Sequence, residues 1–433
     1  MERKLMISRS VSVFILICSM VTAGANAQFT TPSPAPSPAP SATSSATASP
    51  APNATATSIS DFARARIDTM FKTGHADPDW FAASFLSQVS ASQIDTILGQ
   101  IAGTLGSYIG IDGVKGIFTA RFAKGTDEID VHLDNANKID ALFFKPPSMK
   151  AVSLDAALQN LVALERMPGL LSYVVIEGRS QRAALNASAP LAVGSAFKLA
   201  VLAALRARID AGSLHWTDVV PLDPRWKSLP SGVMQTWPDR TPTTIATYAT
   251  QMISISDNTA ADALAHIVGA RALAPFAMRN APFLTTREMF TLKSKPGATQ
   301  RARFRATTSA DIRRAILLKI DALDLPAIAE IETSPMLDIE WHYTVRDLCA
   351  LIARVEDLPV FSINPGLAAR ADFAHVAYKG GSDFGVINLT TFVTTKRGTQ
   401  ICVSATLNDA EKSINDIAFQ SAYSAVVASL ANR

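Results

Sequence analysis

The sequence has little surplus charge and none of the motifs that usually build metal or nucleotide sites. Its 433 residues carry 40 Lys and Arg against 37 Asp and Glu, a formal net charge of +3, with no lysine-rich or arginine-rich run. A nucleic-acid partner needs clustered cations, so it is disfavoured. The six histidines lack His-x-His or His-Glu-x-x-His spacing, and no Gly-x-Gly-x-x-Gly or phosphate-binding loop is present. We therefore expect no metal and no cofactor.

Cysteine is also scarce, with three in the whole chain. Cys18 lies in the apolar leader, so Cys349 and Cys402 are the two that remain in the folded part. Two cysteines far apart in the sequence do not define a disulfide framework. We expect both to be small buried hydrophobic residues.

The first 58 residues are expected to lie outside the folded part. A basic start, an apolar run over residues 11–22 and small residues at 25–27 predict a signal peptide over residues 1–27. The protein is then exported to the periplasm or secreted, and touches a membrane only through this segment before cleavage, unless it stays as an uncleaved anchor. Residues 28–58 are rich in Pro, Ala, Ser and Thr and carry no charge, which predicts a disordered linker.

Residues 59–147 are predicted to form a small α+β domain. Apolar residues recur at helical spacing up to Leu105, with a helix over residues 80–89 and another that Ser92 caps. Beyond Gly110 the pattern alternates as in strands. The order vaguely resembles the cone-shaped fold of steroid isomerases. His132 in one strand is expected to be structural, and we assign this unit no chemistry.

Residues 148–433 are predicted to form one larger domain whose sheet joins both ends of the segment. Two strands come early, three come late, and helices lie between them and at the end. The expected elements are strands over 170–176, 181–185, 374–379, 385–395 and 399–407, and a closing helix over 410–431. This order indicates an α+β sandwich, an antiparallel sheet flanked by helices.

Ser195 and Lys198 form the first of three motifs that carry chemistry. They stand three residues apart at the start of a long predicted helix that ends near Gly212, so both lie on one face. A lysine of lowered pKa can take the proton that makes a serine hydroxyl nucleophilic. The helix N-terminus also favours a developing anion.

The second and third motifs follow in order along the chain. Ser256-Asp257-Asn258 supplies a hydroxyl that can relay a proton and an amide that can bind a substrate carbonyl, although such a tripeptide also caps helices. Lys379-Gly380-Gly381-Ser382 ends a predicted strand, where glycines let a substrate lie against the backbone and the lysine adds positive charge. A glycine-rich hairpin is the alternative interpretation of this third motif.

Together, the three motifs resemble those of penicillin-recognising serine acyltransferases, most closely the class A β-lactamases. The resemblance covers roughly residues 150 to 433 in element order, and the preceding small domain resembles that of the two-domain serine hydrolases of the clavulanic acid pathway. The resemblance implies that Ser195 is the acylated nucleophile and Lys198 its proton acceptor or relay. It also implies that Ser256 passes the proton to the leaving group, Asn258 holds the substrate amide and Lys379 stabilises Ser256 and the substrate carboxylate. The amides of Ser195 and Ser382 would form the oxyanion hole, beside Gly380 and Gly381.

Two departures from that family concern deacylation and substrate choice. Class A enzymes carry Glu-x-x-Leu-Asn, whereas here Leu292 stands four residues after Glu288 and Lys293 replaces the asparagine. Glu288 is the candidate deacylation base, or it pairs with Arg287 in a surface loop. Gly380 stands where a hydroxyl usually binds the substrate carboxylate, and Ser382 is the candidate replacement. This change favours cephalosporin-like molecules or simple esters over penicillins.

The sequence thus predicts an exported serine hydrolase that opens a β-lactam or a related acyl bond through an acyl-enzyme at Ser195. Such an activity would serve β-lactam catabolism or antibiotic resistance. Because the Glu-x-x-Leu-Asn motif is missing, a second hypothesis is that the protein is a D-alanyl-D-alanine peptidase or an esterase with slow deacylation. A third reading is a catalytically idle binding protein in which the first domain recognises the ligand. Ser195 lacks the Gly-x-Ser-x-Gly surroundings of an α/β-hydrolase.

Overall fold

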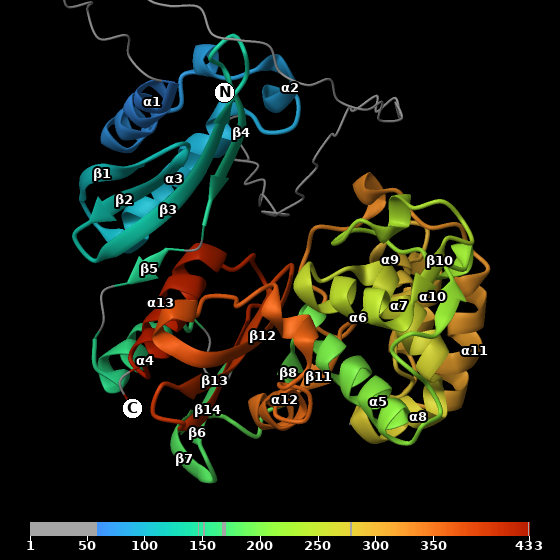
Figure 1. Ribbon diagram of the computed structural model, residues 1–433. Coiled ribbons are helices and arrows are strands. Elements are labelled where there is room, and N and C mark those ends of the chain that lie inside the picture. The colour runs from blue at the N-terminus through green and yellow to red at the C-terminus, as the bar shows by residue number, and fades with distance from the viewer. Residues whose placement is uncertain (1–58, 146, 150–151, 167–169, 278, 432) are drawn as a thin grey trace, which may run out of the picture.

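The computed structural model describes residues 59–145, 147–149, 152–166, 170–277, 279–431 and 433. The predicted signal peptide and linker lie outside these residues. The described chain contains two antiparallel sheets, each with its own helices (Figure 1). Within it, no helix is both long and apolar enough to cross a membrane.

The N-terminal sheet has the order β1-β2-β3-β4, with β5 paired to β3. Its inward side chains, such as Phe118 and Ile129, pack against α1 and α3 in one hydrophobic cluster. The elements are α1 (Ile59–Thr73), α2 (Ala83–Leu86), α3 (Ala91–Leu105), β1 (Tyr108–Val114), β2 (Ile117–Phe122), β3 (Gly125–Leu133), β4 (Ile139–Phe144) and β5 (Ser148–Met149). The predicted α+β composition is confirmed, and the likeness to the cone-shaped fold stays a prediction.

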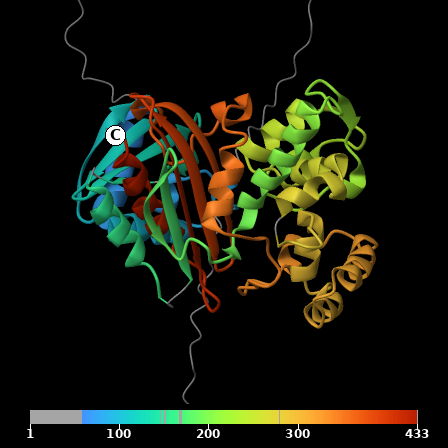
Figure 2. The same ribbon diagram turned by 90° about the horizontal axis from the view of Figure 1, so that it is seen from below.

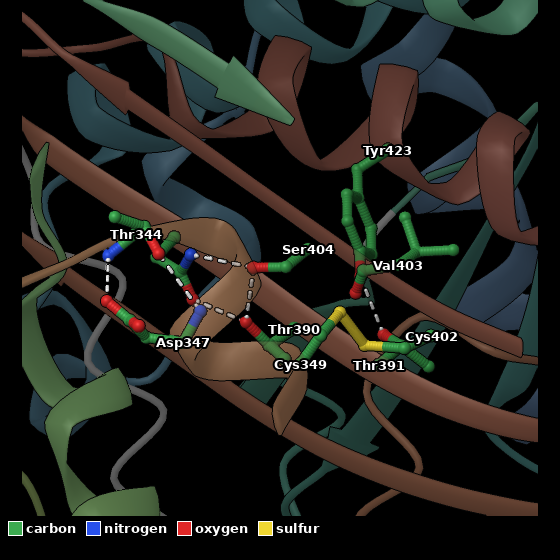
Figure 3. Close-up of a disulfide and its surroundings, with 10 residues drawn as sticks. Thr344, Asp347, Cys349, Thr390, Thr391, Cys402, Val403, Ser404 and Tyr423 are labelled. Carbon is green, nitrogen blue, oxygen red and sulfur yellow. Dashed lines mark hydrogen bonds between the residues drawn. A yellow bond between two sulfur atoms is a disulfide. The ribbon is translucent and has the colours of Figure 1, made fainter. Parts of the chain in front are cut away.

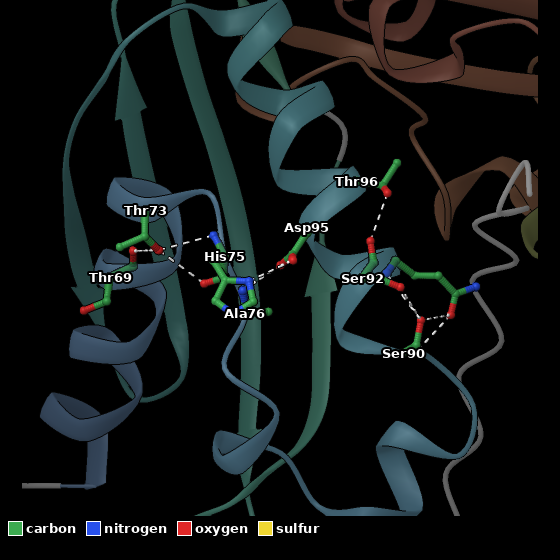
Figure 4. Close-up of polar contacts among 9 residues, drawn as sticks. Thr69, Thr73, His75, Ala76, Ser90, Ser92, Asp95 and Thr96 are labelled. Carbon is green, nitrogen blue, oxygen red and sulfur yellow. Dashed lines mark hydrogen bonds and ion pairs between the residues drawn. The ribbon is translucent and has the colours of Figure 1, made fainter. Parts of the chain in front are cut away.

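Two details of the N-terminal helices differ from the prediction. The chain forms a 3₁₀ turn over Pro78–Trp80 and the short α2 in place of one helix over 80–89. Helix α3 is capped by Ser90 rather than Ser92, because Ser90 makes a reciprocal capping box with Gln93 (Figure 4). In the same view, the Asp95 carboxylate accepts the backbone N–H of Ala76 at 2.6 Å and so ties the turn after α1 to α3.

The second sheet joins strands from both ends of the larger unit, as predicted. Its order is β12-β13-β14-β6-β7, antiparallel throughout. The strands are β6 (Leu171–Glu177), β7 (Ser180–Leu185), β12 (Phe373–Asp383), β13 (Val386–Thr395) and β14 (Gln400–Asn408). The ladder between β14 and β6 closes a long stretch of chain, so the sheet depends on tertiary packing.

Helices cover both faces of this sheet, as Figure 2 shows from below. One face packs on α4 (Leu154–Val162) and α13 (Asp416–Ala428), and the other on α12 (Val345–Ile352). A mostly helical part extends beyond α12 and contains α5 (Lys198–Asp210), α6 (Ile245–Ser254), α7 (Asn258–Val268), α8 (Ala270–Ala277), α9 (Thr286–Lys293), α10 (Ala298–Arg305) and α11 (Ala310–Asp321). The predicted α+β sandwich is confirmed. The closing helix starts later than expected because Asn415 caps it.

The expectation that the two cysteines are only small buried hydrophobic residues is wrong. Cys349 of α12 and Cys402 of β14 are buried and form a disulfide, with Cα atoms 5.8 Å apart (Figure 3). Helix α12 packs on β13 and β14, and this contact brings together two residues that are 53 positions apart. On the other face, the Tyr423 hydroxyl of α13 bonds Thr391 at 2.9 Å, so the two flanking helices are fixed to the same strands.

Candidate active site

Ser195 lies in a 3₁₀ turn (Gly194–Phe197) that runs directly into α5, whose first residue is Lys198. The turn follows the short strand β8 (Leu191–Ala192), which pairs with β11 (His342–Tyr343). Lys198 is fully buried and its Nζ lies 3.1 Å from Ser195 Oγ. Helix α5 ends at Asp210 and Gly212 follows with φ +67°. The predicted pairing of hydroxyl and amine on one helix face is therefore present.

The second motif lies between α6 and α7 and meets Lys198 directly. The Ser256 Oγ lies 3.1 Å from Lys198 Nζ, and Asn258 Oδ1 accepts from the same Nζ at 2.6 Å. Ser256 has φ +58°, a left-handed conformation that is uncommon for a serine. The Asp257 carboxylate caps α7 by accepting the backbone N–H of Ala260, and its other oxygen accepts from the backbone N–H groups of Val233 and Met234.

The third motif reaches the same point from β12. Lys379 is buried, and its Nζ lies 3.0 Å from Ser256 Oγ. The structure thus brings Ser195, Lys198, Ser256 and Lys379 into one continuous set of contacts, although the last two are 123 residues apart. Asn258 is held by donating its amide N–H to the Leu229 carbonyl at 3.0 Å.

Burial lowers the pKa of both lysines in this set. The pKa of Lys198 falls to about 7, because desolvation outweighs the attraction of Asp257 and Asp262. Desolvation, and then the charge of Lys198, lower the pKa of Lys379 well below its ordinary value. A large fraction of Lys198 is therefore a free amine near neutral pH, which is the form that accepts a proton.

The glycines of the third motif let β12 lie against the Ser195 turn. A Cβ at Gly381 would stand 2.4 Å from the Ser195 nitrogen, and a Cβ at Gly194 would stand 2.9 Å from the Ser382 nitrogen. The backbones of the two predicted oxyanion donors therefore approach each other without side chains between them. A Cβ at Gly380 would stand 2.3 Å from the Tyr378 hydroxyl. A side chain at this position, where a hydroxyl residue is usual, would therefore require Tyr378 to move.

Among the described residues, Glu288 makes no hydrogen bond or ion pair with any of the other predicted site residues. It is the third residue of α9, and its carboxylate accepts from the backbone N–H and the hydroxyl of Thr285, at 2.6 and 2.9 Å, in a capping box. Burial raises the pKa of Glu288 to about 8. The predicted pairing with Arg287 is absent as well, because that guanidinium donates to the carbonyls of Lys227 and Leu323.

Thr286 and Asp262 lie beside the site, and the sequence analysis did not predict a role for either residue. The Thr286 hydroxyl bonds Ser228 at 2.7 Å and approaches the Asn258 carbonyl at 3.4 Å. The buried Asp262 carboxylate accepts the backbone N–H of Thr286 and of Arg287. Asn258 and Asp262 are four residues apart on α7, a spacing that places both on one face and was available as a signal.

The described residues contain no group of three His, Cys, Asp or Glu side chains that could hold a metal ion. The contacts at the site are made by hydroxyls, amines, an amide and backbone N–H groups, with the Asp262 carboxylate beside them. Such a set can transfer a proton between serine and lysine, stabilise an anion and bind an amide. The catalytic roles given to these residues stay predictions.

Residues 153–357 match the family model described as the β-lactamase enzyme family. This segment contains the first two motifs, and Lys379 lies beyond it. The match confirms the resemblance to β-lactamases and penicillin-recognising serine hydrolases that the motifs predict. No curated protein matches the chain.

Several solved structures of β-lactamases and a penicillin-binding protein are similar at low identity. A β-lactamase from Sphaerobacter thermophilus is 18% identical, covers 64% of this chain and 98% of its own, and has a TM-score of 0.42. A β-lactamase from Chitinophaga pinensis is 12% identical over 64% of this chain and 97% of its own, with a TM-score of 0.44. The structure of PBP-A is 14% identical over 64% and 98%, with a TM-score of 0.37.

Proposed function

We propose that this chain is a serine hydrolase that opens a β-lactam or a related acyl bond through an acyl-enzyme at Ser195. The observation that carries the proposal is the buried Lys198 amine, 3.1 Å from Ser195 Oγ and with a pKa of about 7. An amine in this state can accept the hydroxyl proton at neutral pH. The family match over residues 153–357 supports a small acyl compound as the substrate.

The contacts support a complete route for the proton during acylation. Lys198 takes the Ser195 proton while Oγ bonds to the carbonyl carbon of the substrate. The carbonyl oxygen then carries a negative charge, which the amides of Ser195 and Ser382 stabilise. When the carbon–nitrogen bond breaks, the leaving nitrogen takes a proton from Ser256, and Lys198 restores that proton across 3.1 Å. Lys379, 3.0 Å from Ser256, stabilises the hydroxyl as its proton leaves.

Deacylation is the step for which a second candidate function has support. Glu288 is engaged in capping α9, and the Thr286 hydroxyl approaches the Asn258 carbonyl. The nearby Asp262 carboxylate is engaged by the backbone N–H groups of Thr286 and Arg287. An enzyme with this arrangement lacks an evident base for the deacylating water. This observation favours a peptidase or esterase that shares the nucleophile but releases its acyl group slowly.

Export is part of the proposal. The signal-like first 27 residues support it, and so does the Cys349–Cys402 disulfide, because disulfides persist mainly in oxidising compartments. We place the protein in the periplasm or outside the cell, where an acyl compound of the cell wall or an antibiotic is accessible.

The experiment that tests this function follows the intact mass of residues 28–433 with time after mixing with a penicillin and with a cephalosporin. Ser195→Ala is the control. An adduct that depends on Ser195 and then clears as product accumulates supports a β-lactamase. A lasting adduct supports the slow-deacylating alternative. If neither β-lactams nor fluorophosphonate esters modify Ser195, the hydrolase proposal is wrong and an idle binding protein is favoured.

A further inference from the structure

A buried cluster of three ionisable side chains lies near the candidate site. Lys293 ends α9, Glu340 precedes β11, and Asp383 is the last residue of β12. The Lys293 Nζ lies 2.5 Å from Glu340 Oε1 and 2.6 Å from Asp383 Oδ2. The three side chains are 5%, 0% and 10% exposed, so solvent does not screen the charges.

Each carboxylate of this cluster is next in sequence to a residue that borders Ser195. Asp383 directly follows Ser382, whose amide is a predicted oxyanion donor. Glu340 directly precedes Trp341, whose carbonyl accepts the Val193 N–H at 3.0 Å. The Trp341 ring also stacks on Phe197, with centroids 3.8 Å apart. The single ammonium of Lys293 therefore joins two backbone segments that lie against the turn containing Ser195.

The contact between the Ser195 turn and β12 is made by glycines at the site itself. Gly194 and Gly381 have no side chains that could lock the Ser195 turn to β12, and a Cβ at either position would be too close to the opposite backbone. Their relative placement must be fixed by neighbouring groups. The ion pair of Lys293 with Asp383 holds the chain in place one residue beyond Ser382.

We propose that Lys293, with Asp383 as its counter-ion, positions the Ser382 amide against the Ser195 turn and so completes the oxyanion hole. Lys293 is a positioning residue, since it acts through Asp383 and touches no reacting atom. The functional part of this proposal rests on the serine-hydrolase function proposed above. The structural part, that the cluster holds the end of β12 in place, stands independently of it.

The two carboxylates of the cluster have different protonation. Burial alone would raise the pKa of Asp383, but Lys293 holds it below its ordinary value. Burial, together with the Asp383 charge, raises the pKa of Glu340. The second oxygen of Glu340 is buried without a donor beside it among the described residues. Glu340 is therefore the carboxylate that holds a proton to the higher pH, and Asp383 is the counter-ion of Lys293.

This difference yields a sharp test with matched variants of the full chain at pH 7. Lys293→Met leaves the buried Asp383 carboxylate without its counter-ion, and Asp383→Asn removes the charge that ties the end of β12 to Lys293, which is then left to Glu340. For both variants we expect the acylation rate constant with a cephalosporin to fall at least about tenfold while noncovalent binding of the substrate is unchanged. Glu340→Gln keeps the shape and the neutral state, so we expect less than about a twofold change. Arg206→Met is the control, because Arg206 near the end of α5 also bridges two carboxylates, Asp210 of the same helix and Asp357 beyond α12, at a more exposed position.

Hydrogen exchange of the backbone supplies a second measurement that needs no activity. We expect Lys293→Met to lose protection in the peptides that contain Ser382 and Ser195, and Arg206→Met to retain it there. An inactive wild type would refute the proposed function, and the exchange data would still decide the positioning role. The proposal is overturned if Lys293→Met keeps protection at Ser382, or if it slows acylation no more than Arg206→Met.

Discussion

The lowered pKa of Lys198 predicts the pH dependence of acylation. Its Nζ is fully buried, lies 3.1 Å from Ser195 Oγ and has a pKa of about 7. Protonation below that value removes the proton acceptor, so acylation should fall on the acid side. A group with this pKa is about 9% free amine at pH 6 and about 91% at pH 8. The acylation rate constant should therefore rise about tenfold between these two values.

The assay is stopped-flow acylation of the wild type by a chromogenic cephalosporin from pH 5 to 9, under single-turnover conditions. Lys198→Arg is the informative variant, because arginine keeps its proton throughout this range. We expect that variant to acylate at least about a hundredfold more slowly and without the rise near pH 7. A wild-type rate constant that is flat between pH 6 and 8, or a rise that persists in Lys198→Arg, would refute the assignment of Lys198 as proton acceptor.

Four further predictions concern other parts of the molecule. Asp127 is fully buried without an ion-pair partner among the described residues, and desolvation raises its pKa well above the ordinary value. The folded state therefore keeps the Asp127 proton that the unfolded state loses above a pKa of about 4, so the folded protein loses stability as pH rises above that value. Asp127→Asn should raise the Tm at pH 7.5 more than at pH 4, and equal shifts at the two pH values would contradict this. Gly381→Ala should lower the acylation rate constant at least about a hundredfold in the stopped-flow assay, since its Cβ would stand 2.4 Å from the Ser195 nitrogen; a rate constant like that of the wild type would count against the placement of β12. The disulfide closes a loop of 53 residues, so Cys349→Ala should lower the free energy of unfolding by about 4 kcal/mol in urea titration; a change below about 1 kcal/mol would argue against the bond. Glu288→Gln can still cap α9 and should leave the lifetime of the acyl-enzyme within about twofold in the mass assay; a greatly lengthened lifetime would identify Glu288 as the deacylation base.

The local part of the site could be predicted from the sequence because it depends on short spacings. Ser195 and Lys198 lie on one helix face by virtue of their three-residue separation, and the start of α5 follows from the same pattern. The order of strands and helices also indicated that distant segments form one sheet, which is what carries Lys379 to Ser256.

The remainder depends on tertiary contacts that no short spacing reveals. The Cys349–Cys402 bond requires α12 to lie on β14, and the Lys293–Glu340–Asp383 cluster joins three separate segments. The position of Glu288 is a different case. Thr285 and Glu288 have the Thr-x-x-Glu spacing that is typical of a capping box at a helix N-terminus. This spacing could have predicted the observed position of Glu288, whereas we interpreted Glu288 as a candidate deacylation base.

The most direct test of the central claim is to locate the covalent adduct after mixing residues 28–433 with a cephalosporin. The reaction is quenched in acid within the first turnovers, and the protein is digested and mapped by mass spectrometry, with Ser195→Ala treated in parallel. We predict that the acyl group lies on the peptide that contains Ser195 and that the variant carries none. An adduct on another residue, or one of equal yield in Ser195→Ala, would contradict the account.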